Sequence, residues 1–183
     1  MIDLLSVEKD FIRGHIKEGG TAVDFTMGNG HDTLWLSDAV GPDGHVYAFD
    51  IQQQALDSSS KLLEAEAKYK NYTLILDSHA NAENHVKEKI CVGMFNLGYL
   101  PGGDKRITTL RTSTMPAVEA AIRLLDDDGG LLIAVYPGHE EGALEGQMLD
   151  GYFETLDRKK ICVSKLKIVN SPTSPFFFLV EKR

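Results

Sequence analysis

The sequence predicts an α/β fold in which helices cover a largely parallel sheet. Short apolar runs alternate with longer amphipathic segments along the 183 residues, a pattern typical of repeated strand–helix units. With 43% hydrophobic and 25% charged residues, the composition is that of a folded domain with one core. No stretch is apolar enough to cross a membrane, and no signal pattern opens the chain. We therefore expect one domain over residues 1–183 and a cytoplasmic location.

The order of the expected elements follows from hydrophobic periodicity. Val7, Phe11, Ile12 and Ile16 recur at helical spacing and predict a covering helix within residues 1–18, in which His15 is interpreted as a packing residue. The next five expected strands are 21–26, 45–50, 72–76, 90–97 and 130–136. The expected helices between and after them are 32–39, 52–69, 108–125 and 140–153.

Two further β-rich runs close the chain. Residues 161–169 and 175–180 are separated by the turn-forming Asn170-Ser171-Pro172. Strands joined by so short a link must be antiparallel. Five alternating units closed by such a pair resemble the class I methyltransferase fold. This resemblance implies a Rossmann-like, seven-stranded and mostly parallel sheet with an antiparallel C-terminal strand.

The net charge of −8 disfavours a protein that holds nucleic acid over its whole surface, because phosphate contacts come mostly from Lys and Arg. Most of the negative charge lies in residues 1–100. Any RNA-facing surface is therefore expected in the second half, where the candidates are Lys105, Arg106 and Arg111 and the basic run 158–160. The alternative is that these are ordinary solvated charges.

The two cysteines, Cys91 and Cys162, are far apart in the sequence and neither belongs to a CxxC pair. This spacing suggests neither a disulfide framework nor a cysteine-based zinc site. We expect two buried free thiols and no metal.

A glycine-bearing loop follows the first expected strand and opens directly into a helix. Ligands of open α/β sheets bind beyond the carboxyl ends of the strands. The dinucleotide fingerprint GxGxxG would need a third glycine where Thr33 stands. Asp32 would repel a pyrophosphate but suits the ammonium and sulfonium of S-adenosylmethionine (SAM), unless it only caps the helix. The expected cofactor residues of this loop are Asp24, Thr26, Met27, Gly28, Asn29, Gly30, Asp32 and Thr33.

The next two strand ends predict further contacts to an adenosine ligand. Asp50 lies 20 residues beyond Gly30, where a carboxylate can accept hydrogen bonds from both ribose hydroxyls. The third strand ends at Asp77-Ser78-His79, whose side chains can recognise the adenine edge, although His79 can also simply start a helix. The residues expected to bind the cofactor here are Asp50, Ile51, Gln52, Ser78 and His79.

The fourth strand runs into the segment 96–105, NLGYLPGGDK. It has the spacing of the NPPY motif of amino-methylating enzymes, with Asn96 and Tyr99 matching and both prolines absent. In that motif the Asn oxygen and a backbone carbonyl orient the acceptor nitrogen, and the aromatic ring packs on the target base. We therefore expect Asn96 to contact both cofactor and acceptor, and Leu97, Gly98 and Tyr99 to contact the substrate. The alternative is a glycine-containing turn.

The fifth strand ends at Tyr136-Pro137-Gly138-His139, which should face the same crevice. Tyr136, Gly138 and His139 are expected to contact the substrate. A histidine there can also accept a proton near neutral pH or cap the next helix.

Together these segments resemble a small bacterial family long labelled rRNA methylases, with a match over nearly the whole chain. Its members convert the 5-aminomethyl group of wobble 5-aminomethyl-2-thiouridine in tRNA to the 5-methylaminomethyl form. The resemblance implies SAM as cofactor and the anticodon region of tRNA as partner. It also implies that Asn96 and the Leu97 carbonyl orient the amine, that Tyr99 packs on the base, and that Asp104 or His139 removes a proton.

Other readings of the sequence stay open. The acceptor can be ribosomal RNA or a small amine instead of tRNA. An NAD-dependent oxidoreductase would place a pyrophosphate beside Asp32, and a SAM- or RNA-binding module would show no turnover. The sequence does not fix the oligomeric state, and a homodimer is compatible with it.

Overall fold

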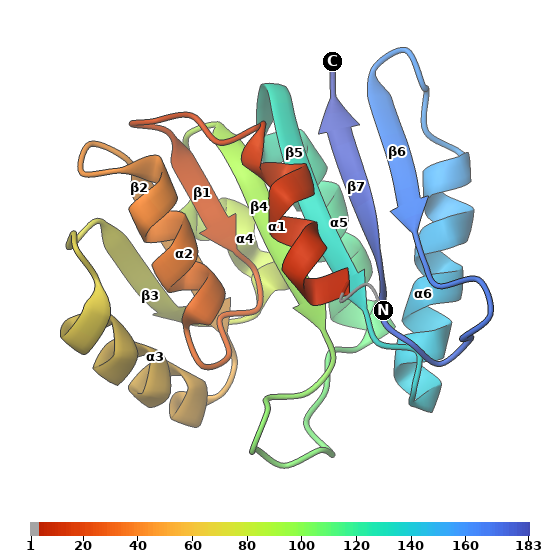
Figure 1. Ribbon diagram of the computed structural model, residues 1–183, viewed down its shortest axis with the longest axis horizontal. Helices are drawn as coiled ribbons and strands as arrows, with labels where there is room; N and C mark the ends of the chain where they lie inside the picture. Colours follow the sequence, from red (N-terminus) through yellow and green to blue (C-terminus); the bar gives the residue numbers. More distant parts are fainter. Residues whose placement is uncertain (1–3) are drawn as a thin grey trace.

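The computed structural model describes residues 4–183, with side chains from residue 7 onward, and places all of its strands in one sheet (Figure 1). The strands are β1 Thr21–Asp24, β2 His45–Asp50, β3 Tyr72–Leu76, β4 Ile90–Leu97, β5 Leu125–Val135, β6 Ile161–Leu166 and β7 Phe176–Lys182. The helices are α1 Leu4–Arg13, α2 His31–Val40, α3 Gln53–Glu66, α4 Ala82–His85, α5 Arg111–Leu124 and α6 Glu140–Glu154, with a 3₁₀ turn η1 at His79–Asn81.

The strand order confirms the predicted class. It runs β3-β2-β1-β4-β5-β7-β6, with β1 to β5 parallel and β7 antiparallel to both of its neighbours. The order reverses between β1 and β4, which is the point where open α/β sheets bind their ligands. The chain therefore has the Rossmann-like methyltransferase fold, with a crevice expected beyond β1 and β4.

Helices cover both faces of the sheet and close two separate hydrophobic cores. On one face Ile12 of α1 and Leu36 and Val40 of α2 pack on the sheet. On the other face α4, α5 and α6 contribute a second cluster, to which Phe153 of α6 belongs. Figure 1 shows α1 crossing in front of β4 and β5. The sequence predicts a covering helix within residues 1–18, and α1 occupies residues 4–13 of that stretch.

The start of α5 differs from the prediction. The helix begins at Arg111 rather than at residue 108, and Thr108 instead pairs with Tyr99 in an isolated antiparallel bridge. Apolar residues recur at helical spacing through this stretch, but the bridge holds its first residues extended. Thr108 and Thr109 therefore lie in the loop after β4, on the ligand side of the sheet.

The fifth strand begins earlier than predicted because it contains a bulge. Leu125 pairs with Ile90, whereas the next pair joins Gly130 to Val92, so residues 126–129 project from the strand. Their sequence, DDDG, reads as a turn, which is why the strand was predicted to begin at residue 130. Hydrophobic periodicity does not reveal that these four turn-like residues form a bulge within one strand.

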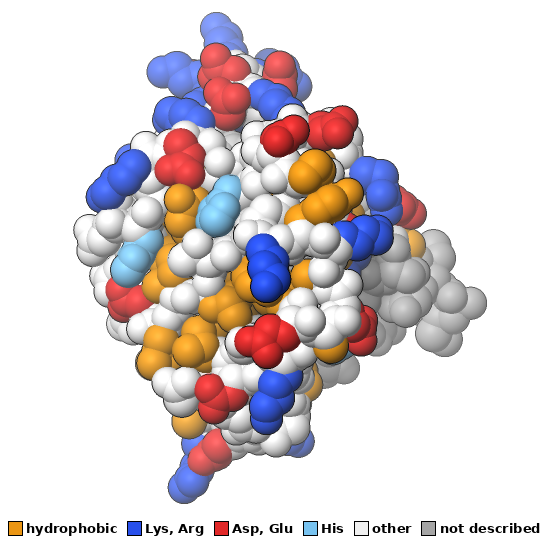
Figure 2. All heavy atoms as spheres, turned by 90° about the vertical axis from the view of Figure 1, so that its left-hand side faces the viewer, with side chains coloured by type: hydrophobic (Ala, Val, Ile, Leu, Met, Phe, Trp, Pro, Cys, Tyr) orange, Lys and Arg blue, Asp and Glu red, His pale blue; other side chains and the backbone are white. Residues whose placement is uncertain are grey.

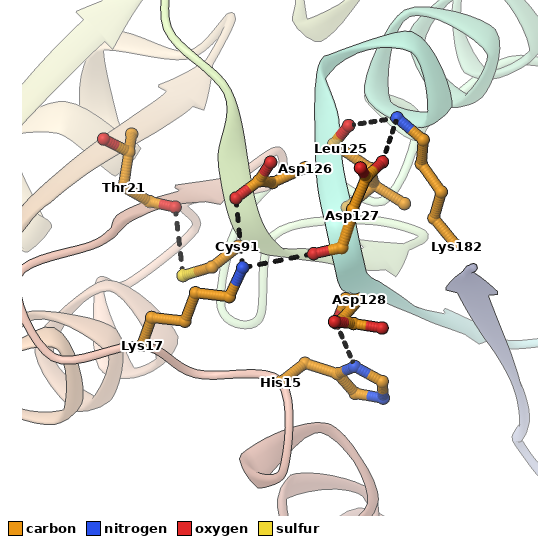
Figure 3. A network of polar contacts seen from close by, with 9 residues as sticks. All are labelled: His15, Lys17, Thr21, Cys91, Leu125, Asp126, Asp127, Asp128 and Lys182. Carbon is orange, nitrogen blue, oxygen red and sulfur yellow. Dashed lines mark hydrogen bonds and ion pairs between the residues drawn. The ribbon is translucent and has the colours of Figure 1, made fainter.

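This bulge holds the segment after α1 (Figure 3). His15 Nδ1 lies 2.7 Å from the carbonyl oxygen of Asp128, and Lys17 Nζ donates to the Asp126 carboxylate at 3.0 Å. Asp128 has a positive φ of 63°, a conformation in which Asp is tolerated better than most residues. His15 is thus a structural residue, in agreement with its interpretation as a packing residue.

The cysteines are both free, as predicted, but they differ in burial. Cys91 is buried and donates to the carbonyl oxygen of Thr21 at 3.3 Å, whereas Cys162 is only partly buried. The prediction of a buried Cys162 was therefore wrong, because β6 is the edge strand of the sheet. Among the helices of residues 4–183, none combines the length and the apolarity needed to span a membrane.

Gly30 should be essential to the fold because its position excludes any side chain. It has φ +86° at the start of α2, and an added Cβ would lie 2.9 Å from the Cα of Ser59 in α3. We expect Gly30→Ala to lower the free energy of unfolding by about 2 kcal/mol or more, through backbone strain and overlap. Urea unfolding followed by circular dichroism measures this loss.

Gly151→Ala is the matched control, because Gly151 lies in α6 and an added Cβ meets nothing within 4 Å. This variant should be as stable as the unmodified protein, or more stable by about 0.5–1 kcal/mol. Equal stability of Gly30→Ala and Gly151→Ala would contradict the argument.

Candidate active site

A cavity of about 890 Å³ opens at the carboxyl ends of the parallel strands, within the range of roughly 300–1,000 Å³ common for small-molecule sites. Loops after β1, β2, β3, β4 and β5 contribute to it. Most of the predicted site residues line it, namely Thr26, Met27, Gly28, Asn29, Asp32, Asp50, Ile51, Gln52, Ser78, His79, Asn96, Leu97, Gly98, Tyr99, Tyr136, Gly138 and His139. Within residues 4–183 no group of three or more His, Cys, Asp or Glu side chains is arranged to hold a metal ion.

Seven predicted site residues do not line the cavity. They are Asp24, Gly30, Thr33, Asp104, Lys105, Arg106 and Arg111. The first three are buried, whereas the last four are exposed. Each group has its own physical reason for lying outside.

Asp24 supports the loop from behind instead of facing the cavity. Its carboxylate is fully buried and accepts hydrogen bonds from the Thr33 hydroxyl at 2.7 Å and the Thr26 amide at 3.1 Å. Burial, together with the nearby charge of Asp32, raises the pKa of Asp24 to about 7. Thr33, fully buried, is the partner of Asp24 and not a ligand contact. These residues therefore fix the shape of the loop.

Asp32 joins the start of α2 to the end of β4. Its Oδ2 accepts a hydrogen bond from Asn96 Nδ2 at 2.7 Å, and its Oδ1 lies 2.6 Å from the ammonium of Lys9 in α1. The Asn96 backbone amide donates to the Thr26 hydroxyl at 2.7 Å. The amide nitrogen of Asn96 thus faces Asp32, and its oxygen is on the side of the Tyr136 hydroxyl. The Asp32 carboxylate thus binds one ammonium group, that of Lys9.

Tyr136 lies next to Asn96 at the end of β5. Its hydroxyl is 3.5 Å from Asn96 Oδ1, at the long limit of a hydrogen bond. Burial, with the charges of Glu8 and Asp32 adding to it, raises the pKa of Tyr136 to about 12. The phenol is therefore neutral near pH 7 and acts as a donor toward the cavity, not as a base.

Asp50 is held by the backbone of two loops. Its Oδ2 accepts from the Gly28 amide at 3.0 Å, and its Oδ1 accepts from the Gln52 amide at 2.9 Å. Each carboxylate oxygen has a further lone pair, so both can accept another hydrogen bond from a ligand in the cavity. Ile51 beside it is 61% exposed and offers an apolar surface at the cavity wall.

His79 is buried at the end of the loop after β3. Its Nδ1 lies 3.0 Å from the Phe25 carbonyl oxygen, and its Nε2 has no hydrogen-bond partner within the described part of the chain. Because a carbonyl can only accept, Nδ1 carries the proton and Nε2 is an acceptor. Burial lowers the pKa of His79, so the ring is neutral. His79 is also the first residue of η1. Starting a helix and facing a ligand are therefore compatible roles for this residue.

The loop after β4, residues 98–110, projects below the sheet in Figure 1 and is closed at its base. The Thr109 amide donates to the Gly98 carbonyl at 2.9 Å, and the Thr109 hydroxyl donates to Glu145 of α6 at 2.9 Å. Glu145 is fully buried and also accepts from Thr114 in α5. Burial raises the pKa of Glu145. This carboxylate therefore anchors the loop to two helices, a role that the sequence did not suggest.

The charged residues of this loop are paired or exposed. Arg106 binds the carboxylate of Asp104 at 2.6 Å, and Arg111 lies 3.0 Å from Glu141. Hydrogen bonds from Arg106 lower the pKa of Asp104, which makes it a weaker proton acceptor and does not support the predicted role in proton removal. Lys105 lies over the Tyr99 ring, 5.5 Å from its centroid.

Basic side chains do not form a continuous surface on the face of β3 and α3. There Lys and Arg are interspersed with Asp and Glu (Figure 2). The run 158–160 precedes β6, whose first residue pairs with Lys182 near the end of β7. That is the opposite end of the sheet from the loop 98–110 (Figure 1). The run 158–160 therefore does not line the cavity.

His139 caps α6. Its Nδ1 accepts a hydrogen bond from the Gly142 amide at 3.1 Å, as an N-cap side chain does. The ring lies next to Tyr99, with centroids 6.1 Å apart. His139 is thus both a helix cap and a wall of the cavity.

Several lining residues were not predicted from the sequence. Glu8 and Lys9 reach the cavity from α1, and Thr173 and Pro175 reach it from the loop between β6 and β7. Others come from the loop after β4, namely Leu100, Pro101, Ile107, Thr108, Thr109 and Leu110. No local pattern marks the contributions of α1 or of residues 173–175, because only the folded chain brings them to this edge.

Comparison with known proteins places these features in context. A family model described as "Putative rRNA methylase" matches residues 46–182. The tRNA (mnm(5)s(2)U34)-methyltransferase, chloroplastic, of Arabidopsis thaliana is 37% identical over 178 residues, or 92% of this chain, and the chain spans 65% of that relative's length. Ribosomal RNA small subunit methyltransferase H of Oenococcus oeni is 38% identical over 74 residues, 40% of this chain and 22% of that relative.

Two solved structures resemble the whole chain. A putative rRNA methylase from Clostridium thermocellum is 34% identical with a TM-score of 0.95, and the match covers 100% of this chain and 99% of that one. A putative methyltransferase from Streptococcus mutans, solved in complex with SAH, is 32% identical with a TM-score of 0.89. This match also covers 100% of this chain and 99% of that one. The fold is thus that of these two solved structures.

Proposed function

The chain belongs to the "Putative rRNA methylase" family and is a SAM-dependent methyltransferase, and from this premise we propose that it methylates the 5-aminomethyl group of 5-aminomethyl-2-thiouridine at the wobble position of tRNA. The activity in the name of the Arabidopsis relative supports this substrate, and the chain spans 65% of that relative's length. The observation that carries transfer to a nitrogen is the orientation of the Asn96 amide, whose nitrogen donates to Asp32 and whose oxygen can therefore accept a hydrogen bond from an amine.

The part of the cavity lined by Asp32, Asp50 and His79, here called the cofactor half, fits SAM. Asp32 already accepts one ammonium, that of Lys9. Asp50 keeps free lone pairs for ribose hydroxyls, and His79 Nε2 is an unpaired buried acceptor suited to the exocyclic amine of adenine. When bound, SAM supplies a methyl group activated by its sulfonium. Asp32, Asp50 and His79 would hold it, with Ile51 against the adenine ring.

The part of the cavity lined by Asn96, Leu97 and Tyr99, here called the acceptor half, would orient the amine that accepts the methyl group. Asn96 Oδ1 and the Leu97 carbonyl accept hydrogen bonds from the neutral amine and so direct its lone pair away from them, toward the cofactor half. The exposed Tyr99 ring offers a stacking surface for the base. Orientation of this kind can contribute on the order of 7–11 kcal/mol to a reaction between two bound groups. The proposal therefore assigns most of the rate to positioning.

Methyl transfer to nucleosides is the direct test of this proposal. The purified protein would be incubated with isotope-labelled SAM and with tRNA from cells that lack the methylated form, and the nucleosides analysed by mass spectrometry. We expect label only in 5-methylaminomethyl-2-thiouridine. Label in ribosomal RNA supplied in parallel, and none in tRNA, would favour the rRNA alternative suggested by the family's name and by the similarity to methyltransferase H.

Lys105 should make the strongest electrostatic contact to tRNA on the loop after β4. Arg106 and Arg111 are engaged by carboxylates, whereas no carboxylate within the described residues pairs with Lys105. We expect Lys105→Ala to weaken tRNA binding and to reduce the slope of log affinity against log salt by about 1. Fluorescence anisotropy at several salt concentrations measures both.

Lys61→Ala is the control for this experiment, because Lys61 is an exposed residue of α3 that does not line the cavity. It should leave the salt slope unchanged. If Lys105→Ala and Lys61→Ala behave alike, the loop is a solvated surface without a phosphate contact.

Cofactor affinity should rise between about pH 6 and 7.5 because of Asp24. In the free protein the pKa of Asp24 is raised to about 7 by burial and by Asp32. A cation bound beside Asp32 would favour the ionised carboxylate and lower this pKa, so binding below pH 7 must release a proton. We expect affinity to increase by at most about tenfold per pH unit in this interval. Calorimetry in buffers of different ionisation enthalpy detects the released proton.

Asp24→Asn should abolish this proton release, with the amide oxygen accepting from the Thr26 amide and the amide NH2 facing the Thr33 hydroxyl, which can turn to accept from it. The raised pKa of Asp24 also determines how the free energy of unfolding depends on pH. Because the folded pKa is raised above its ordinary value, the free energy of unfolding should fall as the pH rises toward and through 7. A proton release that persists in Asp24→Asn would assign it to another group.

A further inference from the structure

His139 has two ring nitrogens in opposite situations. Nδ1 accepts the hydrogen bond of the Gly142 amide at the start of α6, at 3.1 Å. Nε2 is buried and has no hydrogen-bond partner within the part of the chain that the structure describes. His139 lines the cavity. A buried polar atom without a partner in a ligand cavity indicates that the ligand supplies one.

The cap bond determines which nitrogen carries the proton. A backbone amide can only donate, so Nδ1 must be the unprotonated nitrogen of the ring. The proton of the neutral imidazole is then on Nε2. The free nitrogen of His139 is therefore a hydrogen-bond donor, and it has no lone pair with which to accept a proton from a substrate.

Nε2 lies between the first turn of α6 and the segment after β4, since a Cβ placed on Gly142 would lie 2.9 Å from it. A Cβ placed on Gly98 would lie 4.0 Å from His139 Nε2 and 3.9 Å from the Tyr136 ring. Thr108, the bridge partner of Tyr99, has a buried hydroxyl that is likewise without a partner among residues 4–183. Two unpaired polar groups thus flank the segment that carries the stacking ring of Tyr99.

We propose that His139 Nε2–H donates a hydrogen bond to an exocyclic oxygen or sulfur of the pyrimidine that carries the methyl-accepting amine, with the Thr108 hydroxyl as a neighbouring contact. This inference rests on the proposed function. A base stacked on Tyr99 presents its edge to the side walls of the cavity, where His139 stands, and pyrimidine edges bear such acceptors. His139 then selects and positions the base, and it does not remove the proton from the amine.

The protonation state can be measured without any substrate. Long-range ¹H–¹⁵N correlation spectra of protein labelled at histidine distinguish the two neutral tautomers and the cation, with His139→Asn used to assign the signals. We expect the Nε2–H tautomer of His139 at pH 7. The Nδ1–H tautomer, or a cation, would overturn the proposal. Because this readout does not depend on methyl transfer, it stands even if the protein proves inactive on tRNA.

Two variants separate the cap from the contact with the base. The side-chain oxygen of His139→Asn takes the place of Nδ1 and keeps the cap, but nothing takes the place of Nε2. The side-chain amide of His139→Gln reaches the place of Nε2 and loses the cap. We expect His139→Asn to raise KM for 5-aminomethyl-2-thiouridine tRNA by about tenfold, as for loss of one hydrogen bond, with an unchanged melting temperature and SAM affinity.

His139→Gln should show the reverse behaviour, with a lower melting temperature and a KM nearer to that of the unmodified protein. A wild-type KM in His139→Asn would overturn the proposal, as would a parallel loss of SAM affinity, which would assign the donor to the cofactor. A rate loss in His139→Asn that is restored at about pH 9.5 would show that His139 is a proton acceptor after all. If the unmodified protein methylates no tRNA, the proposed function fails, and the tautomer measurement alone decides the state of His139.

Discussion

Replacing Asn96 by Ala should lower the single-turnover rate of methyl transfer by about 10²-fold or more, with little change in SAM affinity, because misplacement of an attacking group is costly. Asn96 is held at three atoms. Its amide proton is bound by Thr26, its Nδ2 by Asp32, and its Oδ1 is approached by the Tyr136 hydroxyl. Few side chains in the cavity are so fully oriented, and the oxygen is the atom left to bind an amine.

Rapid-quench single-turnover measurements from about pH 6.5 to 9.5 would separate positioning from proton removal. A loss that is independent of pH agrees with positioning, whereas alkaline rescue indicates a missing base. Lys61→Ala, at an exposed residue of α3 that does not line the cavity, should retain the full rate. Asp104→Ala should also retain most activity at every pH, since Asp104 pairs with Arg106 and does not line the cavity. Loss of SAM binding in Asn96→Ala would instead make Asn96 a cofactor residue.

The central strands of the sheet could be predicted because they are buried on both faces. The run 90–97, for example, is apolar at nearly every position and is buried along almost its whole length in β4. The short link between the last two runs predicted their antiparallel pairing, and β6 and β7 are indeed antiparallel. Continuous apolar runs and very short connections are local features, so the sequence alone carries them.

The elements whose bounds differ from the prediction depend on contacts between residues that are distant in the sequence. The start of α5 is displaced because Thr108 pairs with Tyr99 across the loop. The bulge at residues 126–129 is held by His15 and Lys17, more than a hundred residues earlier in the chain. Neither contact leaves a periodic signal. The short helices between β3 and β4 were missed for a related reason, since four helical residues, AENH, contain no repeating apolar position.

The cavity wall was predicted well where it follows directly from a strand end. Asp32, Asp50, Asn96 and Tyr136 all line it, because parallel strands bring their carboxyl ends to one edge. Sequence proximity to that edge was not sufficient, however. Asp24 is the last residue of β1 and yet turns into the protein. Whether a side chain at a strand end faces the ligand or the core depends on the path of the next loop.

Asp50 illustrates why a correctly placed residue still needs a careful test. Its carboxylate holds the Gly28 amide of one loop and the Gln52 amide of another. Removing it can therefore weaken a ligand contact, loosen the loops, or do both. A variant that keeps one accepting oxygen in place distinguishes these effects.

We expect Asp50→Ala to weaken the binding of both SAM and its demethylated product by about 1.5–3 kcal/mol, as for the loss of hydrogen bonds to a charged group. Asp50→Asn should lose less, because the amide oxygen can still accept one bond. Asp43→Ala, at an exposed position before β2, is the control and should bind normally. Isothermal calorimetry gives the affinities, and melting temperatures show whether the loops remain intact. If Asp50→Ala binds SAM as tightly as the unmodified protein, the ribose lies elsewhere in the cavity, and the orientation of the cofactor relative to Asn96 must be reversed or shifted. A loss of the same size in Asp50→Asn with an unchanged melting temperature would show that the charge itself, and not the accepting atom, binds the ribose.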